Sequence, residues 1–137
     1  MIVIDTGPLV AFANQEDPLH ARAVDALERA WGGEHGEAFS TDFVLDEGMT
    51  VLMIRVGRKS VSQEYARLFD GSTERPLNPM MSTPADVLQA AIEIHLRHFE
   101  RRLSFTDCTL VAHAKRRNAK VLTFDRGFDG LVEVVHP

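Results

Sequence analysis

The stretch that decides the fold is Ile2-Val3-Ile4-Asp5, in which a run of β-branched residues ends directly at an acid. A short, fully apolar run of this kind is typical of a strand buried on both faces of a parallel sheet. The arrangement returns near the end of the chain as Val121-Leu122-Thr123-Phe124-Asp125. Ligands of open parallel sheets bind beyond the carboxyl ends of the strands, so both acids are candidates for a binding site. Either acid alone can equally form a turn or cap a helix.

Helical patterns lie between these strands. We expect helices over residues 17–31, 42–56, 60–69, 83–100 and 105–117, and further strands over 38–40 and 131–135. Asp17-Pro18 and Thr83-Pro84 each supply an N-cap residue followed by a proline suited to the first helical position. Residues 76–81 include two prolines, Pro76 and Pro79, and should be extended. The alternation of strands and helices predicts an α/β sandwich with a mainly parallel sheet, in one domain covering residues 1–137.

The composition excludes several classes of protein. The chain of 137 residues is 45% hydrophobic and 26% charged, which is normal for a globular domain. Its single cysteine, Cys108, excludes an internal disulfide framework and a cysteine-based zinc site. No apolar run has the length of a membrane span, and the first apolar run meets an acid at Asp5, unlike a signal peptide. We therefore expect a cytoplasmic protein without membrane attachment.

Glu47 lies in a segment that is apolar almost all round, residues 43–54. At helical spacing it shares a face with Val44 and Val51, and no lysine or arginine of this segment is placed to pair with it. A carboxylate on an apolar face costs several kcal/mol unless a partner compensates its charge, and a metal ion is one such partner. The alternative is a rotated helix in which Glu47 reaches solvent.

Asp107 has two interpretations of about equal weight. Leu110 and Val111 share its helix face, which directs the acid inward, whereas Ser104-Phe105-Thr106-Asp107 also fits the capping-box pattern at a helix start. The joint pattern is stronger than any single acid, because Asp5 and Asp125 follow strands while Glu47 and Asp107 lie on inward helix faces. Like charges disfavour ionisation when packed together, and hard divalent cations with oxygen ligands resolve that conflict.

The chain resembles the PIN-domain nucleases, specifically the short VapC-like toxins of type II toxin–antitoxin pairs. The resemblance rests on four segments in family order: Ile4-Asp5-Thr6-Gly7-Pro8-Leu9-Val10-Ala11, Ser40-Thr41-Asp42-Phe43-Val44-Leu45-Asp46-Glu47, Leu103-Ser104-Phe105-Thr106-Asp107 and Leu122-Thr123-Phe124-Asp125-Arg126-Gly127-Phe128. It spans essentially the whole chain. It implies a Rossmann-like three-layer sandwich and a magnesium- or manganese-dependent endoribonuclease that forms a homodimer and is inhibited by a VapB-like antitoxin.

The resemblance also implies roles for particular residues. It makes four acids both catalytic and metal-binding: Asp5, Glu47, Asp107 and Asp125. It implies supporting hydroxyls at Thr6 and Thr123. It selects Glu47 over Asp46, and it places Asp129 second to Asp125 because Asp129 lies beyond the motif.

The partner of such a nuclease would be a polyanion, yet the chain has a net charge of −5. RNA must then be held by bound cations and local basic residues. Arg116 and Arg117 are candidates for RNA contact, although cations at a helix C-terminus also complement the helix dipole.

Two alternatives stay open. One is a catalytically silent PIN-like binding module. The other is an α/β phosphotransfer protein with a phosphorylated strand-end aspartate, although Gly7 stands where aspartate-nucleophile phosphatases carry a second acid.

Overall fold

The central feature of the computed structural model, which describes residues 1–72 and 80–137, is a parallel sheet of four strands in the order β2-β1-β3-β4. The strands are β1 (Ile2–Ile4), β2 (Ala38–Phe39), β3 (Lys120–Leu122) and β4 (Val134–Val135). β1 is fully buried, as expected for a central strand covered on both faces. In the register, Ile4 of β1 lies beside Leu122 of β3. Asp5 and Thr123, the next residues of the two strands, therefore leave the sheet side by side.

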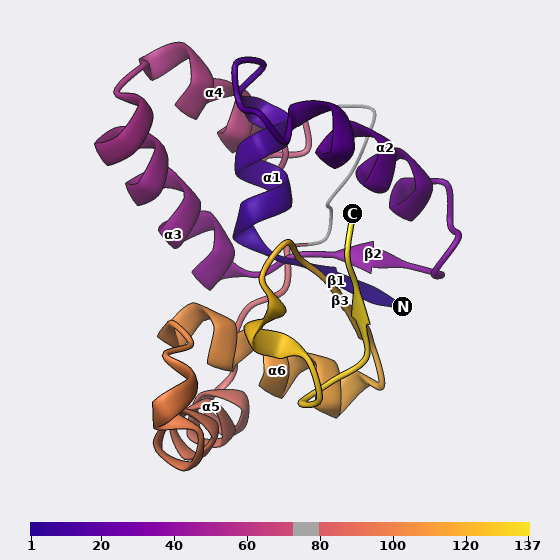
Figure 1. The fold of residues 1–137 in the computed structure, drawn as a ribbon, viewed down its shortest axis with the longest axis vertical. Helices are drawn as coiled ribbons and strands as arrows, with labels where there is room; N and C mark the ends of the chain where they lie inside the picture. Colours follow the sequence, from indigo (N-terminus) through magenta and orange to yellow (C-terminus); the bar gives the residue numbers. More distant parts are fainter. Residues whose placement is uncertain (73–79) are drawn as a thin grey trace.

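Helices cover both faces of this sheet. The helices are α1 (Thr6–Ala13), α2 (His20–Trp31), α3 (Asp42–Val51), α4 (Lys59–Arg67), α5 (Ala85–Arg97) and α6 (Phe105–Arg117). A π-helical turn, η1 (Leu52–Val56), extends α3, and two short 3₁₀ turns are η2 (Phe99–Arg101) and η3 (Arg126–Phe128). Figure 1 shows α1 and α2 above the strands and α5 and α6 below them. The predicted α/β sandwich with a parallel central sheet is confirmed.

The largest departure from the sequence prediction is α1, which we did not expect. Gly7 and Pro8 resemble turn residues, yet Pro8 falls in the first helical turn, where its missing N–H has no partner to lose. Asp5 caps this helix by accepting a hydrogen bond from the Thr6 N–H. The first acid therefore stands at a junction between a strand and a helix.

Two helix starts were placed wrongly. α2 begins at His20, because Asp17 accepts a hydrogen bond from the Leu19 N–H in a turn that precedes the helix. α5 begins at Ala85 after an extended Pro84, while Thr83 donates its hydroxyl to Asp42 of α3. The extended segment predicted over 76–81 falls mostly outside the described residues.

Tyr65 of α4 fixes the position of α3 over the core. Its side chain is fully buried, and its hydroxyl donates to the Val44 carbonyl at 2.6 Å. The ring lies so close to α3 that a Cβ added at Gly48 would be 2.0 Å from the Tyr65 hydroxyl oxygen. Gly48 is therefore the residue that allows this helix contact, one position after Glu47.

We expect Gly48→Ala to lower the free energy of unfolding by roughly 1–3 kcal/mol, because overpacked cores are strained by about this amount. Gly7→Ala is the matched control: a Cβ there would lie 3.6 Å from the Phe124 ring, an ordinary contact. Urea unfolding of both variants measures the difference. Equal stability of the two variants would show that α3 and α4 do not pack as described.

Candidate metal centre

The carboxyl edge of the sheet opens into a cavity of about 470 Å³. All four predicted acids line it: Asp5, Glu47, Asp107 and Asp125. They come from the end of β1, from α3, from the first turn of α6 and from the loop after β3. Segments far apart in the sequence are thus joined where the parallel strands end, as expected for an open parallel sheet.

Asp5 is held by the two strands and the helix that meet at it. Its backbone N–H donates to the Leu122 carbonyl at 3.0 Å. One carboxylate oxygen accepts from the Thr6 N–H and the other from the Thr123 hydroxyl, both at 2.7 Å. The residue is only 6% exposed. Its carboxylate therefore has a single well-determined orientation.

A single hydroxyl connects Asp107 to Glu47. Asp107 and Ser104 form a complete capping box, in which the Asp107 carboxylate accepts from the Ser104 N–H at 2.7 Å. The Ser104 hydroxyl accepts from the Asp107 N–H and donates to a Glu47 carboxylate oxygen at 3.2 Å. Both interpretations of Asp107 are therefore correct: it completes the capping box of α6, and it also lines the cavity.

Three of the four acids come close enough to share one ion. Asp5, Glu47 and Asp107 each offer an oxygen, and these oxygens lie within 4.8 Å of one another. Within residues 1–72 and 80–137, no other group of three histidines, cysteines or acids meets this condition. Asp125 lines the same cavity but does not belong to this group. Its carboxylate accepts a hydrogen bond from the Gly127 N–H, and its backbone N–H donates to the Thr123 hydroxyl.

Burial perturbs two of these carboxylates. The pKa of Asp5 is raised to about 7, mainly by desolvation and in smaller part by the negative charges of Asp107 and Glu47, while the hydrogen bonds from Thr123 and Thr6 lower it. The pKa of Asp107 is raised to about 6, again mainly by desolvation, with repulsion from Glu47 and Asp125 adding to it and the Ser104 hydrogen bonds opposing it. Both shifts mean that the folded chain disfavours the charged forms of these two carboxylates.

The donor set fits a hard divalent cation. Carboxylate oxygens are the ligands that Mg²⁺ and Mn²⁺ prefer, and a cation would offset the mutual repulsion of the acids. Thr6 adds a second observation: the residue lines the cavity, and its buried hydroxyl has no hydrogen-bond partner among the described residues. Buried hydroxyls of this kind call for a bound water or ligand.

The remaining predicted residues lie elsewhere. Asp46 is exposed and does not line the cavity. Asp129 accepts from His136 at 2.8 Å and also lies outside the cavity lining. Arg116 pairs with Asp86 of α5, and the Arg117 guanidinium lies over the Phe39 ring. Both arginines are in the last turn of α6, about 14 Å along the helix axis from Asp107, so RNA contact there stays a prediction.

Sequence reasoning missed three polar residues that line the cavity: Asp17, Arg55 and Ser104. Ser104 had a usable signal, since the capping-box pattern already joined it to Asp107. Arg55 comes eight residues after Glu47. Its place on the same side of the helix depends on the π-helical turn η1, which the sequence does not predict. Asp17 offered no signal beyond its capping role.

Comparison with known proteins matches residues 2–133 to the PIN domain. The chain belongs to the PIN-domain family. None of the described helices of this PIN domain has the length and apolar character needed to cross a membrane.

Two curated relatives are VapC proteins. This PIN domain is 32% identical over 138 residues to the 23S rRNA-specific endonuclease VapC20 of Mycobacterium tuberculosis, covering 98% of each chain. It is 27% identical over 127 residues to a VapC ribonuclease of Archaeoglobus fulgidus, covering 92% of this chain and 78% of that protein.

Solved structures show the same fold. The crystal structure of the Mycobacterium tuberculosis VapC20, described as a sarcin-ricin loop cleaving toxin, superposes with a TM-score of 0.79 at 28% identity, covering all of both chains. VapBC2 of Rickettsia felis, solved with a DNA fragment from its promoter, gives a TM-score of 0.68 at 16% identity, covering 100% of this chain and 99% of that one. The second match supports the fold alone.

The raised pKa of Asp5 makes the stability of the metal-free PIN domain depend on pH. Between the ordinary value of 3.8 and about 7, the folded chain keeps a proton that the unfolded chain has lost. The stability contributed by this proton is complete below the unfolded pKa and is lost as the pH rises through the folded one. In a chelating buffer we expect the free energy of unfolding to fall across this window by a few kcal/mol, since one pKa unit is about 1.4 kcal/mol.

Asp5→Asn should remove the part of this dependence that Asp5 causes and leave the part that Asp107 causes between its ordinary pKa of 3.8 and about 6, so that the variant exceeds the unaltered protein in stability above about pH 7. Added Mg²⁺ should restore the stability that the unaltered protein loses at high pH, and it should not change the stability of the variant. Urea unfolding of both proteins across the pH range gives the comparison. Identical pH profiles for the two proteins would mean that Asp5 is not the buried, uncompensated group described.

Proposed function

We propose that this PIN domain is a metal-dependent endoribonuclease that hydrolyses phosphodiester bonds in RNA, acting as the toxin of a toxin–antitoxin pair. The observation that carries the proposal is the cluster of Asp5, Glu47 and Asp107 oxygens at the carboxyl edge of the sheet. Membership of the PIN-domain family and the ribonuclease relatives support it. The whole chain would act as one PIN-like domain.

In this proposal Asp5, Glu47 and Asp107 hold Mg²⁺ or Mn²⁺, and Asp125 completes the acidic wall of the cavity. When bound, such an ion lowers the pKa of a water and neutralises charge developing on a phosphate. Thr123 holds the Asp5 carboxylate in place, and Ser104 does the same for Glu47 and Asp107. No histidine or lysine lies among the described residues that line the cavity, so we assign neither as a general base.

The partner and oligomer proposals follow from the same relatives. We propose a VapB-like antitoxin and a homodimer, in the cytoplasm where the RNA substrate lies. Light scattering of the purified chain, alone and with the product of a neighbouring reading frame, tests both. A monomer that binds no such product would contradict them.

The direct test of activity is cleavage of total cellular RNA by the purified protein with Mg²⁺ or Mn²⁺ and with a chelator. We expect discrete fragments that need the metal. Asp5→Asn, Glu47→Gln and Asp107→Asn should each reduce the cleavage rate by roughly 100-fold or more, because each replaces an anionic carboxylate ligand with a neutral amide. Asp125→Asn should also reduce it, by a smaller factor.

Asp46→Asn is the matched control for these variants, since it removes one carboxylate beside Glu47 on the exposed side of α3. It should cleave at the unaltered rate. Normal cleavage by Asp5→Asn would contradict the proposed mechanism. A folded, metal-binding protein without cleavage of any RNA would favour the binding-module alternative, and a phosphate found on Asp5 or Asp125 by mass spectrometry would favour phosphotransfer.

A further inference from the structure

Among the described residues, the acidic cavity is lined by one basic residue. Arg55, in η1, is the only lysine or arginine among the described residues that line it. The same lining holds five acids: Asp5, Asp17, Glu47, Asp107 and Asp125. A polyanionic strand that enters this cavity meets a strongly negative surface, so a fixed positive charge at its wall has a large effect on binding.

The π-helical turn brings Arg55 to this position. Glu47, Val51 and Arg55 all line the cavity and follow one another at spacings of four residues. In a continuous α-helix each such step advances about 40° around the axis, so Arg55 would point about 80° away from Glu47. η1 is wider, with the Gly57 N–H bonded to the Leu52 carbonyl five residues before it, and the slower winding returns Arg55 toward the side of Glu47.

The Arg55 side chain has no polar partner among the described residues. Its side chain is exposed, and it forms no hydrogen bond or ion pair within residues 1–72 and 80–137. Arg58, only three residues later, is held by Glu16 at 2.7 Å and by Asn14 at 2.8 Å. The neighbouring arginine is therefore fixed in an ion pair on another surface, whereas the Arg55 guanidinium is available to a ligand in the cavity.

We infer that Arg55 binds a backbone phosphate of the RNA strand at the wall of the cavity formed by α3 and η1, and so holds the strand against the carboxylates. The inference rests on the proposed function. A guanidinium offers paired N–H donors that match two phosphate oxygens, which suits this role better than an ammonium group. The contact is one of binding and positioning, and no bond is made or broken at Arg55.

The test measures RNA affinity against salt concentration. An Asp5→Asn background prevents cleavage, and the probe is a short fluorescein-labelled single-stranded RNA followed by fluorescence anisotropy in Mg²⁺ buffer. Adding Arg55→Gln should weaken binding by roughly 10- to 100-fold, the loss typical of a hydrogen bond to a charged group. It should also make the slope of log affinity against log salt shallower by about 0.7, the value for one phosphate contact on a single strand.

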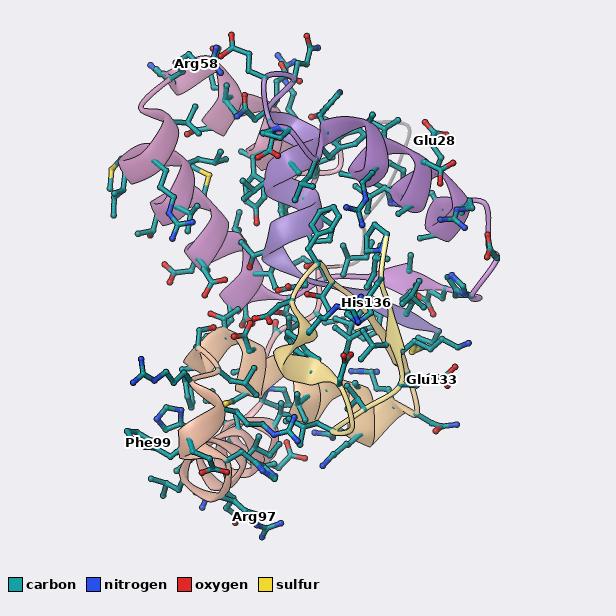
Figure 2. All side chains as sticks on the ribbon, viewed as in Figure 1. Glu28, Arg58, Arg97, Phe99, Glu133 and His136 are labelled. Atoms are coloured by element: carbon teal, nitrogen blue, oxygen red, sulfur yellow. The ribbon has the colours of Figure 1, made fainter. Side chains whose placement is uncertain are left out.

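Two further variants make the result specific. Arg55→Lys keeps the charge, so the salt slope should stay the same while part of the affinity is lost. Arg97→Gln removes an equal charge from α5, at the lower end of the molecule in Figure 2 and outside the cavity, and should change neither quantity. Arg55 is exposed, so the unfolding temperature of Arg55→Gln should match that of the background.

An unchanged salt slope in Arg55→Gln, with or without a loss of affinity, would overturn the inference, because no phosphate contact would then have been removed. The same would follow if Arg97→Gln gave the larger change in slope. An Asp5→Asn background that binds no RNA at any salt concentration would overturn the inference alone, because Arg55 would then not hold the strand. The proposed function fails separately, and the inference with it, if the unaltered protein cleaves no RNA in Mg²⁺ or Mn²⁺ or if the Asp5→Asn background still cleaves it.

Discussion

The organisation of the site depends on one electrostatic constraint, which is that three carboxylates approach within 4.8 Å of one another at the wall of a cavity, with Asp5 buried and Glu47 half-buried. Desolvation and mutual repulsion raise the pKa values of Asp5 and Asp107, so the folded chain alone does not stabilise their charged forms. A bound cation would therefore stabilise the folded chain, because it would offset the repulsion between these carboxylates. This constraint explains why the site is built from rigid strand ends and helix starts, which resist the outward movement of the carboxylates.

Local backbone capping supplies that rigidity. Asp5 caps α1, Asp107 belongs to the capping box of α6, and Asp125 caps η3. Each capping bond satisfies a free N–H at a helix start and also sets the direction of a carboxylate. The positive ends of α1 and α6 partly offset the negative charge there. Ordinary helix capping and the metal centre are therefore two consequences of the same contacts.

The sequence predicted those parts of the molecule that depend on local pattern. The apolar run ending at Asp5 identified the end of β1, and the uncompensated apolar face around Glu47 identified a second contributor. The strand predicted to run up to Asp125 was too long, because β3 ends at Leu122 and Asp125 lies in the following loop as the cap of η3. The sequence did not predict α1, because Gly7 and Pro8 are typical turn residues, whereas the residues of α1 that pack into the core, Leu9 and Ala11, come after them. It did not predict the π-turn or the contact of Tyr65 with Gly48, because both arise from tertiary packing between α3 and α4.

The most direct test of the central claim is a crystal structure of the protein soaked in Mn²⁺, examined by anomalous scattering. The account predicts a manganese peak within coordination distance of oxygens from Asp5, Glu47 and Asp107, at the carboxyl edge of the sheet. A well-ordered cavity with no anomalous peak, or a peak held by other residues, would contradict it.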